Sequence, residues 1–220
     1  MIKVALVDDH QLFRKSLSLL LSTFEDIEVV YDTSDGLAFL KTVEDTLIDV
    51  VLLDIQMPII DGFEVCSRLK VLNPDVKILI ISQLTSKEAI HQIMECGANG
   101  FFTKNSAPEL LENAIKSVIE KDYYFDIELA SVIREAILWE KKILYNDDLS
   151  IQINLTPREI EIIKMASQEK SSKEIADVLC ISTRTVEKHR KRIMEKTNCK
   201  NFIGVILHAL KTNAISLGEL

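Results

Sequence analysis

The 220-residue sequence predicts a larger α/β domain with a doubly wound parallel sheet, followed by a smaller all-helical domain. Two observations support this division: short apolar runs alternate with amphipathic stretches over residues 1–120, and only helical patterns occur beyond residue 155. Residues 1–120 carry 10 basic and 19 acidic side chains, whereas residues 151–220 carry 12 and 8. Because the net charge is −8, we expect any contact with a polyanion to be confined to the C-terminal domain.

The apolar runs of the first domain have the length and aliphatic composition of strands that are buried on both faces. They span residues 2–7, 27–31, 49–55, 76–82 and 100–103. Amphipathic stretches between them predict helices around residues 12–24, 63–69, 90–94 and 110–118. Each parallel pair of strands needs such a crossover helix, and folds of this kind place their sites at the carboxyl ends of the strands.

The segment that joins the two domains has a pattern of its own. Residues 127–143 predict one further helix, and residues 145–150 read as a solvated linker. We therefore expect domains at 1–122 and 151–220, with a linker at 123–150. The linker helix leaves two outcomes open: a docked, autoinhibited monomer, or a helix that pairs with its counterpart in a dimer.

The C-terminal domain has clear helix start signals. Thr156 is an N-cap followed by Pro157 and, in the first turn, Glu159, which predicts a helix that runs to about Ser167. Further helices are predicted at about 172–179, 183–196 and 202–211. Residues 180–183 are too few for anything but a tight turn, and a tight turn before a basic helix indicates a helix-turn-helix.

Polar residues follow the predicted strands of the first domain. Asp8 and Asp9 come directly after the first strand, and Asp54 ends the third, which should be its neighbour in the sheet. Carboxylates that converge repel one another unless a cation neutralises them, and oxygen ligands suit Mg²⁺. Lys104 follows the fifth strand and Ser82 ends the fourth. A single Asp at a strand end is usually a turn residue, but this joint pattern predicts phosphoryl transfer to a carboxylate.

The segments VALVDDH, VVLLDIQMPIIDG, ILIIS and GANGFFTK closely resemble the receiver domain of response regulators, over residues 1–122. The resemblance implies a flavodoxin-like fold of five parallel strands and phosphorylation by a sensor histidine kinase. It also implies a role for each matching residue: Asp54 as phosphoacceptor, Asp8, Asp9, Asp54 and the backbone carbonyl of Gln56 as Mg²⁺ ligands, Lys104 as the partner of the phosphoryl group, and Ser82 and Phe101 as switch residues.

The departures from the receiver pattern are small. Ser82 replaces the commoner Thr and keeps the hydroxyl donor, whereas Phe101 replaces the commoner Tyr and loses one. Gln56 and Leu84 stand where the family sets the lifetime of the phosphoryl group. Leu84 cannot orient a water, so we expect slow self-dephosphorylation.

The third C-terminal helix, TRTVEKHRKRIMEK, has one apolar and one cationic face. Val186, His189 and Ile193 fall on the face predicted to be buried. A cationic helix of this kind fits the major groove of DNA. The alternatives are a solvated helix, which would mix charge signs more evenly, and a membrane-surface helix, which would need aromatic residues and a wider apolar face.

LTPREIEIIKMAS and SSKEIADVLCISTRTVEKHRKRIMEKT closely resemble the four-helix LuxR-type helix-turn-helix of NarL/FixJ regulators, over about residues 155–212. The resemblance implies dimerisation partly through the fourth helix and a structural role for His189. Glu187 stands where the family often has Lys, and it would either read a cytosine amino group or weaken binding. Glu169 replaces the usual glycine after the first helix. The expected DNA-binding residues are Arg184, Thr185, Lys188, Lys191 and Arg192.

We therefore predict a transcriptional response regulator and not an enzyme, with a sensor histidine kinase and double-stranded promoter DNA as partners, and a homodimer when phosphorylated. An aspartate-based phosphatase is a weaker alternative, because Gln56 stands where such enzymes carry a second Asp. A DNA-binding protein with a vestigial receiver is another, and the complete acidic set disfavours it. No apolar run spans a bilayer, so we expect no membrane partner. The four scattered cysteines predict buried thiols in the cytoplasm.

Overall fold

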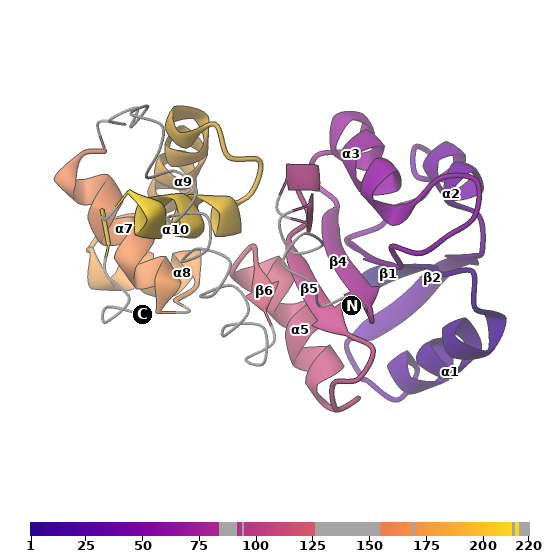
Figure 1. The fold of residues 1–220 in the computed structure, drawn as a ribbon. Coiled ribbons are helices and arrows are strands. Elements are labelled where there is room, and N and C mark those ends of the chain that lie inside the picture. Colours follow the sequence, from indigo (N-terminus) through magenta and orange to yellow (C-terminus); the bar gives the residue numbers. More distant parts are fainter. Residues whose placement is uncertain (84–91, 94, 126–154, 169, 213, 216–220) are drawn as a thin grey trace. The chain divides into compact units, whose positions relative to one another are not determined.

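The structure is a computed structural model that describes residues 1–83, 92–93, 95–125, 155–168, 170–212 and 214–215. The chain divides into two compact units, Met1–Ile127 and Glu128–Leu220 (Figure 1). Several features of the sequence analysis lie outside the described residues. They are the linker helix predicted at 127–143, most of the helix predicted at 90–94, Leu84 and Glu169.

The first unit is built on a parallel sheet with the strand order β2-β1-β3-β4-β5-β6. The strands are β1 (Ile2–Val7), β2 (Ile27–Thr33), β3 (Val50–Leu53), β4 (Lys77–Ser82), β5 (Gly100–Thr103) and β6 (Tyr124–Phe125). The five predicted strands and the doubly wound order are confirmed. The sequence did not predict β6, because two residues are too few to form a recognisable apolar run.

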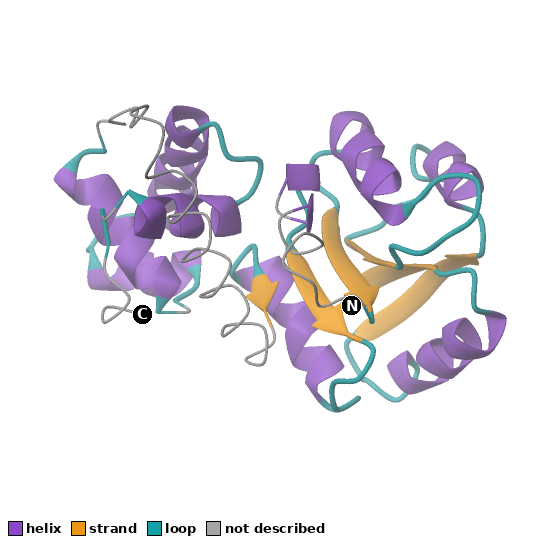
Figure 2. Ribbon diagram, in the orientation of Figure 1, coloured by secondary structure: helices purple, strands orange, loops and turns teal. Residues whose placement is uncertain are grey.

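Helices cover both faces of this sheet (Figure 2). The helices α1 (Gln11–Leu21) and α5 (Leu110–Glu120) share a core with the strands, and α2 (Gly36–Thr42) packs beside α3 (Gly62–Leu72). The sequence analysis missed α2, whose seven residues show little amphipathic pattern. The apolar stripe Leu12, Leu17, Leu20, Leu21 and Phe24 that predicts α1 includes one wrong position, because Leu12 is exposed and Phe13 packs against the core instead.

The register of the strands brings the polar residues to one edge of the sheet. Val7 pairs with Leu53, and the Asp54 backbone N–H donates to the Val7 carbonyl at 2.8 Å. On β4, Ser82 pairs with Thr103, and the Lys104 N–H donates to the Ser82 carbonyl at 3.0 Å. The residues that follow β1, β3 and β5 therefore emerge side by side.

The second unit contains α7 (Pro157–Ser167), α8 (Ser172–Val178), α9 (Thr183–Thr197) and α10 (Phe202–Lys211), which agree with the predicted helices to within about one residue. Thr156 and Ser171 each begin a helix with a reciprocal capping box, and the Ser182 side chain caps α9. Cys180 sits between α8 and α9 with a φ of 52°, which gives the tight turn of a helix-turn-helix.

The cysteines follow the prediction only in part. Cys66 and Cys96 are buried, but Cys180 is exposed and Cys199 is half-buried. The prediction of four buried thiols is wrong for Cys180, because the left-handed turn between α8 and α9 lies at the surface. Within the described residues, no helix is both long enough and apolar enough to span a bilayer.

Candidate functional site

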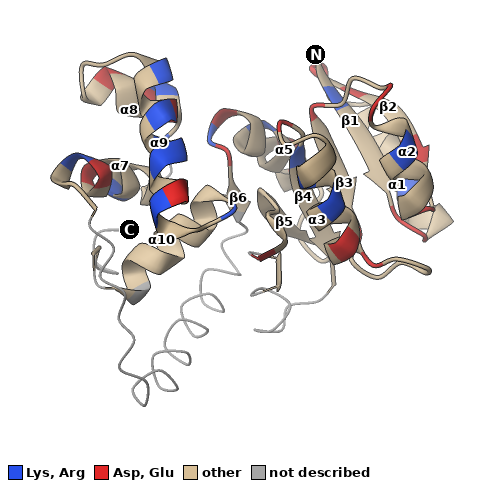
Figure 3. Cartoon of the chain, turned by 90° about the horizontal axis from the view of Figure 1, so that it is seen from above, with Lys and Arg blue, Asp and Glu red and all other residues tan. Residues whose placement is uncertain are grey.

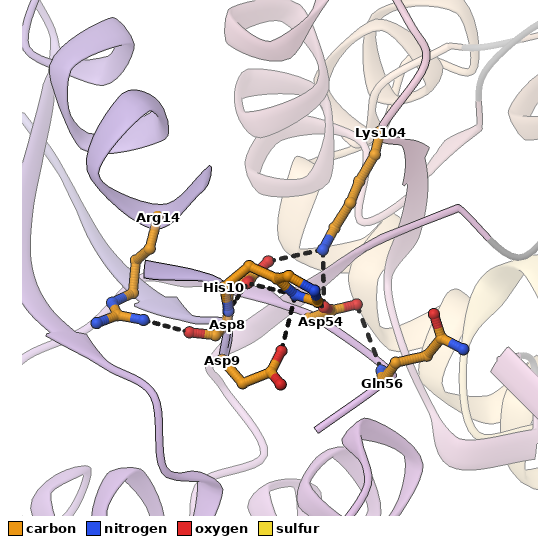
Figure 4. Close-up of polar contacts among 7 residues, drawn as sticks. All are labelled: Asp8, Asp9, His10, Arg14, Asp54, Gln56 and Lys104. Carbon is orange, nitrogen blue, oxygen red and sulfur yellow. Dashed lines mark hydrogen bonds and ion pairs between the residues drawn. The ribbon is translucent and has the colours of Figure 1, made fainter. Parts of the chain in front are cut away.

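The carboxyl edge of the sheet holds a lysine between two carboxylates (Figure 4). Lys104 Nζ donates to Asp8 Oδ2 at 2.8 Å and to Asp54 Oδ2 at 2.7 Å. Asp8 and Asp54 are buried, and only 10% of the Lys104 side chain is exposed. Because attraction between charges is strong where water is excluded, this lysine holds together groups from three different strand ends.

The surroundings in the pocket shift the pKa values of Asp54 and Lys104. Burial raises the pKa of Asp54 above its ordinary value and the nearby Asp8 carboxylate adds to this, whereas the hydrogen bond and charge of Lys104 oppose it. Burial acts to lower the pKa of Lys104, but its hydrogen bonds and ion pairs with Asp54 and Asp8 outweigh burial, and the pKa is raised. Lys104 is therefore a fixed positive charge in the pocket.

Asp9 and His10 form the outer part of this acidic pocket. His10 Nδ1 lies 2.9 Å from Asp9 Oδ1 and 3.9 Å from Asp54 Oδ2, within ion-pair distance when the imidazole is protonated. Asp9 Oδ1 is itself buried and accepts no hydrogen bond from the described residues. The sequence analysis missed His10, although its place directly after the acidic pair and before a helix was visible.

The donor set of the pocket fits a divalent cation. Atoms of Asp8, Asp9, His10 and Asp54 that could act as ligands all lie within 4.8 Å of one another. Three carboxylates face a single lysine, so the pocket has an excess of negative charge. Carboxylate oxygens are ligands that Mg²⁺ prefers, and the residues present therefore suit it.

Two residues of α1 support the pocket from the side and were also missed. The Arg14 Nη1 group donates to the backbone carbonyl of Asp8, and the Phe13 ring lies 4.6 Å from Lys104 Nζ. Lys104 is thus held by carboxylates and by the face of an aromatic ring. Both contacts join residues that are far apart in the sequence or sit in an irregular turn, so residue spacing alone did not indicate them.

The loop after β3 brings its backbone close to Asp54. The Gln56 N–H lies 3.4 Å from Asp54 Oδ1, while the Gln56 side chain is exposed. Gly62 donates its N–H to the Ile55 carbonyl at 2.9 Å, and a Cβ at this position would lie only 2.2 Å from the Asp54 carbonyl oxygen. Only glycine permits this close approach, so the loop stays packed against the end of β3.

The structure places the two expected switch residues on adjacent strands. Ser82 ends β4 and is fully buried, and Phe101 lies on β5 with 1% of its surface exposed. Ser82 and Lys104 are joined by the backbone hydrogen bond between their strands. Ser82 and Phe101 therefore lie on neighbouring strands that both lead to the edge of the sheet where Lys104 is found.

The second charged surface is the outer face of α9 (Figure 3). Its exposed cations lie on one side of the helix, and Val186 and Ile193 are fully buried on the other. Lys196, near the end of the helix, pairs with Glu159, but within the described part of the chain the other exposed cations of α9 pair with no carboxylate. This cationic face consists of Arg184, Lys188, Lys191 and Arg192. Thr185, also expected to contact DNA, is half-buried.

Arg190 belongs to the core and not to the cationic face. It is 2% exposed, its Nη1 donates to Ser172 Oγ at 3.0 Å, and its guanidinium lies 4.2 Å from the centre of the Phe202 ring. It therefore ties α9 to α8 and α10. Composition gave no way to separate Arg190 from Arg192, which is exposed. His189 is half-buried between the two faces.

Comparison with known families assigns both halves of the chain. The family model of the response regulator receiver domain matches residues 4–116, and that of the LuxR family of bacterial regulatory proteins matches residues 153–209. The chain is a two-component response regulator of the NarL/FixJ type. It is a DNA-binding regulator and not an enzyme, as the sequence predicted.

Relatives match the regulator over nearly its whole length. It is 31% identical to the oxygen regulatory protein NreC of Staphylococcus epidermidis over 214 residues, which cover 95% of this chain and 97% of that protein. NreC of Staphylococcus carnosus is 32% identical over 213 residues, with the same shares covered.

Solved structures share the fold. RcsB from Salmonella enterica serovar Typhimurium, bound to a promoter in the presence of a phosphomimetic, matches with a TM-score of 0.58 and 22% identity, over 96% of this chain and 98% of that one. A LuxR-family response regulator from Aurantimonas matches with a TM-score of 0.58 and 25% identity, over 62% of this chain and 97% of that one.

Proposed function

We propose that a partner histidine kinase phosphorylates Asp54 in the presence of Mg²⁺ and that this modification favours dimerisation and promoter binding. The observation on which this proposal rests is the Lys104 ammonium, which bridges the buried Asp8 and Asp54 carboxylates at 2.8 and 2.7 Å. No structural need of the sheet explains three charged side chains at this edge, because burial of charges is costly.

In the proposed transfer, an Asp54 carboxylate oxygen attacks the phosphorus of a phosphohistidine. A P–O bond forms as the P–N bond breaks, and the electron pair of that bond leaves with the imidazole. Asp8, Asp9, Asp54 and the backbone carbonyl of Gln56 would hold Mg²⁺, which supplies charge neutralisation for the phosphoryl oxygens when bound. Lys104 already donates to Asp54 Oδ2, so its ammonium is close enough to form an ion pair with the phosphoryl group on Asp54.

The phosphoryl group would then change the contacts of residues that are buried in the resting pocket. We propose that the Ser82 hydroxyl turns toward it and that the Phe101 ring follows, since both lie on strands that adjoin Lys104. The resulting change on the surface near β5 and α5 favours a homodimer. Two copies of α9 would then bind promoter DNA, each through the cationic face. We place this activity in the cytoplasm.

The direct test of the phosphorylation step is intact-protein mass spectrometry with acetyl phosphate, a small-molecule phosphodonor. Wild type should gain one phosphoryl group with Mg²⁺ and none with EDTA, and Asp54→Asn should gain none in either case. Asp75→Asn, which removes an exposed carboxylate outside the pocket, should behave as wild type. Equal modification of wild type and Asp54→Asn would contradict the assignment of the acceptor.

A further inference from the structure

Of the two acidic side chains of α9, Glu187 lies in the N-terminal half of the helix, beside the cationic face, and Glu195 lies two turns later. Glu187 is exposed and lies one turn after Arg184, one turn before Lys191 and next to Lys188. A surface that served only to attract phosphate groups would gain nothing from a carboxylate in this place, because the carboxylate repels them. Glu187 therefore needs an explanation other than attraction to the DNA backbone.

Glu187 is also not held by its neighbours on the helix. Glu112 and Lys116 form an ion pair of 2.7 Å across one turn of α5, and Glu64 and Arg68 pair in the same way on α3. Glu187 and Lys191 have the same spacing and the same favourable order, Glu before Lys. Across the described residues, however, Glu187 forms no ion pair or side-chain hydrogen bond. Its carboxylate is thus free to accept a donor from another molecule.

The donors available to a carboxylate in the major groove are few. Cytosine presents its N4 amino group and adenine its N6 amino group, but adenine also presents the N7 acceptor beside it. A carboxylate is an acceptor only and is repelled by N7, whereas cytosine presents its donor without an acceptor on the same base in the major groove. The N-terminal half of a recognition helix is the part that approaches base edges, and Glu187 is the fifth residue of α9.

We infer that Glu187 reads the amino group of a cytosine in each half-site of the target DNA and so sets base specificity, while the surrounding cations set affinity. This inference rests on the proposed contact between α9 and the major groove. It separates two roles on one face: Lys191 and Arg184 attract any duplex, and Glu187 selects among sequences. Loss of the carboxylate should therefore change the selected sequence and not abolish binding.

The test is selection of binding sites from a random duplex pool by the full-length regulator, treated with Mg²⁺ and acetyl phosphate. Wild type should select C at one fixed position of each half-site, with about tenfold discrimination. Glu187→Gln should move this preference toward A, because a Gln amide can pair with both N6 and N7. Glu187→Ala should lose the preference at this position, and the rest of the selected sequence should not change.

Glu195→Gln is the matched control, since Glu195 is exposed on the same helix two turns later and its loss changes the charge equally. It should select the wild-type sequence. If Glu187→Gln also selects the wild-type sequence, and both variants merely bind all duplexes more tightly, the inference is wrong. Lys191→Ala tests the proposed contact separately: if it binds DNA as wild type does, α9 is not the contact surface and the proposed function fails with the inference.

Discussion

The two charged clusters of this regulator are organised in opposite ways. In the acidic pocket, the buried carboxylates of Asp8 and Asp54 are met by Lys104 within 3 Å, and α1 adds an aromatic ring and an arginine around them. On α9, the cations of the cationic face are exposed and have no carboxylate partner among the described residues. The carboxylates of the first cluster have a cationic partner within the fold, whereas the cations of the second have none among the described residues.

This difference indicates what each cluster does. In a buried pocket whose charged groups contact one another, an added phosphoryl group or divalent cation would change those contacts. An exposed cluster without internal partners has little to rearrange and instead attracts an external polyanion. The pocket is therefore suited to respond to a modification, and the cationic face is suited to bind a polyanion. Variants can test whether the two clusters have these separate roles.

The largest expected effect comes from removal of the pocket's cation. Lys104→Met leaves two buried carboxylates without a partner, and the first unit should lose about 3–5 kcal/mol of unfolding free energy in EDTA. Mg²⁺ should restore part of this loss, because it replaces the missing positive charge. Without Lys104 the pKa of Asp54 should rise further, so the loss should shrink as the pH falls and the carboxyl becomes protonated.

Denaturant unfolding with and without Mg²⁺ measures this effect. Lys116→Met is the control, because Lys116 forms only surface ion pairs, with Glu112 and Asp26, and it should unfold as wild type does in both conditions. If Lys104→Met and Lys116→Met were equally stable, the pocket would not be a set of buried, mutually compensated charges.

The next effect separates two arginines of α9. Arg190→Leu removes the hydrogen bond to Ser172 and the contact with Phe202 and should cost about 2–4 kcal/mol in unfolding free energy. Arg192→Ala should change stability by less than about 0.5 kcal/mol yet weaken DNA binding. Urea unfolding and DNA titration of both variants test this. The reverse result would place Arg190 on the DNA surface and contradict the core assignment.

A smaller effect is expected at the start of α7. Burial acts to raise the pKa of Glu159, but its ion pair with Lys196 at 2.7 Å and the hydrogen bond from the Thr156 N–H hold the pKa below its ordinary value of 4.5. The stabilisation is therefore complete above about pH 4.5 and is lost as the pH falls through the lower value in the folded state.

Glu159→Gln should accordingly cost about 1 kcal/mol at neutral pH. Its unfolding free energy should also vary less with pH between 5 and 2 than that of wild type. Unfolding measured across this range compares the two proteins. An unchanged acid dependence in the variant would show that folding does not lower the pKa of Glu159.

The smallest effect concerns a single exposed cation. Arg184→Ala should reduce the steepness of log K against log salt concentration by about 0.9, because one fewer counterion is released on DNA binding. Arg158→Ala is the comparison, since Arg158 is engaged by Glu161 and by the Leu179 carbonyl, and it should leave the salt dependence unchanged. Fluorescence anisotropy titrations of labelled DNA at several salt concentrations give this slope for each variant. Equal slopes for wild type and Arg184→Ala would exclude a phosphate contact.

The sequence was sufficient to predict the features that follow a regular pattern. The five strands, the helix starts at Thr156 and Ser182, and the convergence of Asp8 and Asp54 follow from periodicity, capping and parallel topology. The sequence did not predict contacts that depend on side-chain direction. Arg190 and Arg192 are the same residue type two positions apart, yet Arg190 is buried and Arg192 is exposed. His10 and Phe13 were missed because turn and helix geometry, and not spacing, decides whether they face the pocket.

The central claim is that phosphorylation in the acidic pocket alters the binding of DNA by the cationic face of α9. It is tested most directly by anisotropy titrations of a fluorescent duplex, taken from those that the regulator selects, with wild type and Asp54→Asn, each with and without acetyl phosphate in Mg²⁺. We predict that acetyl phosphate tightens binding of wild type about tenfold or more, in the range of ordinary coupling energies, and leaves Asp54→Asn unchanged. Equal affinity for wild type in both states would mean that the pocket does not control the helix.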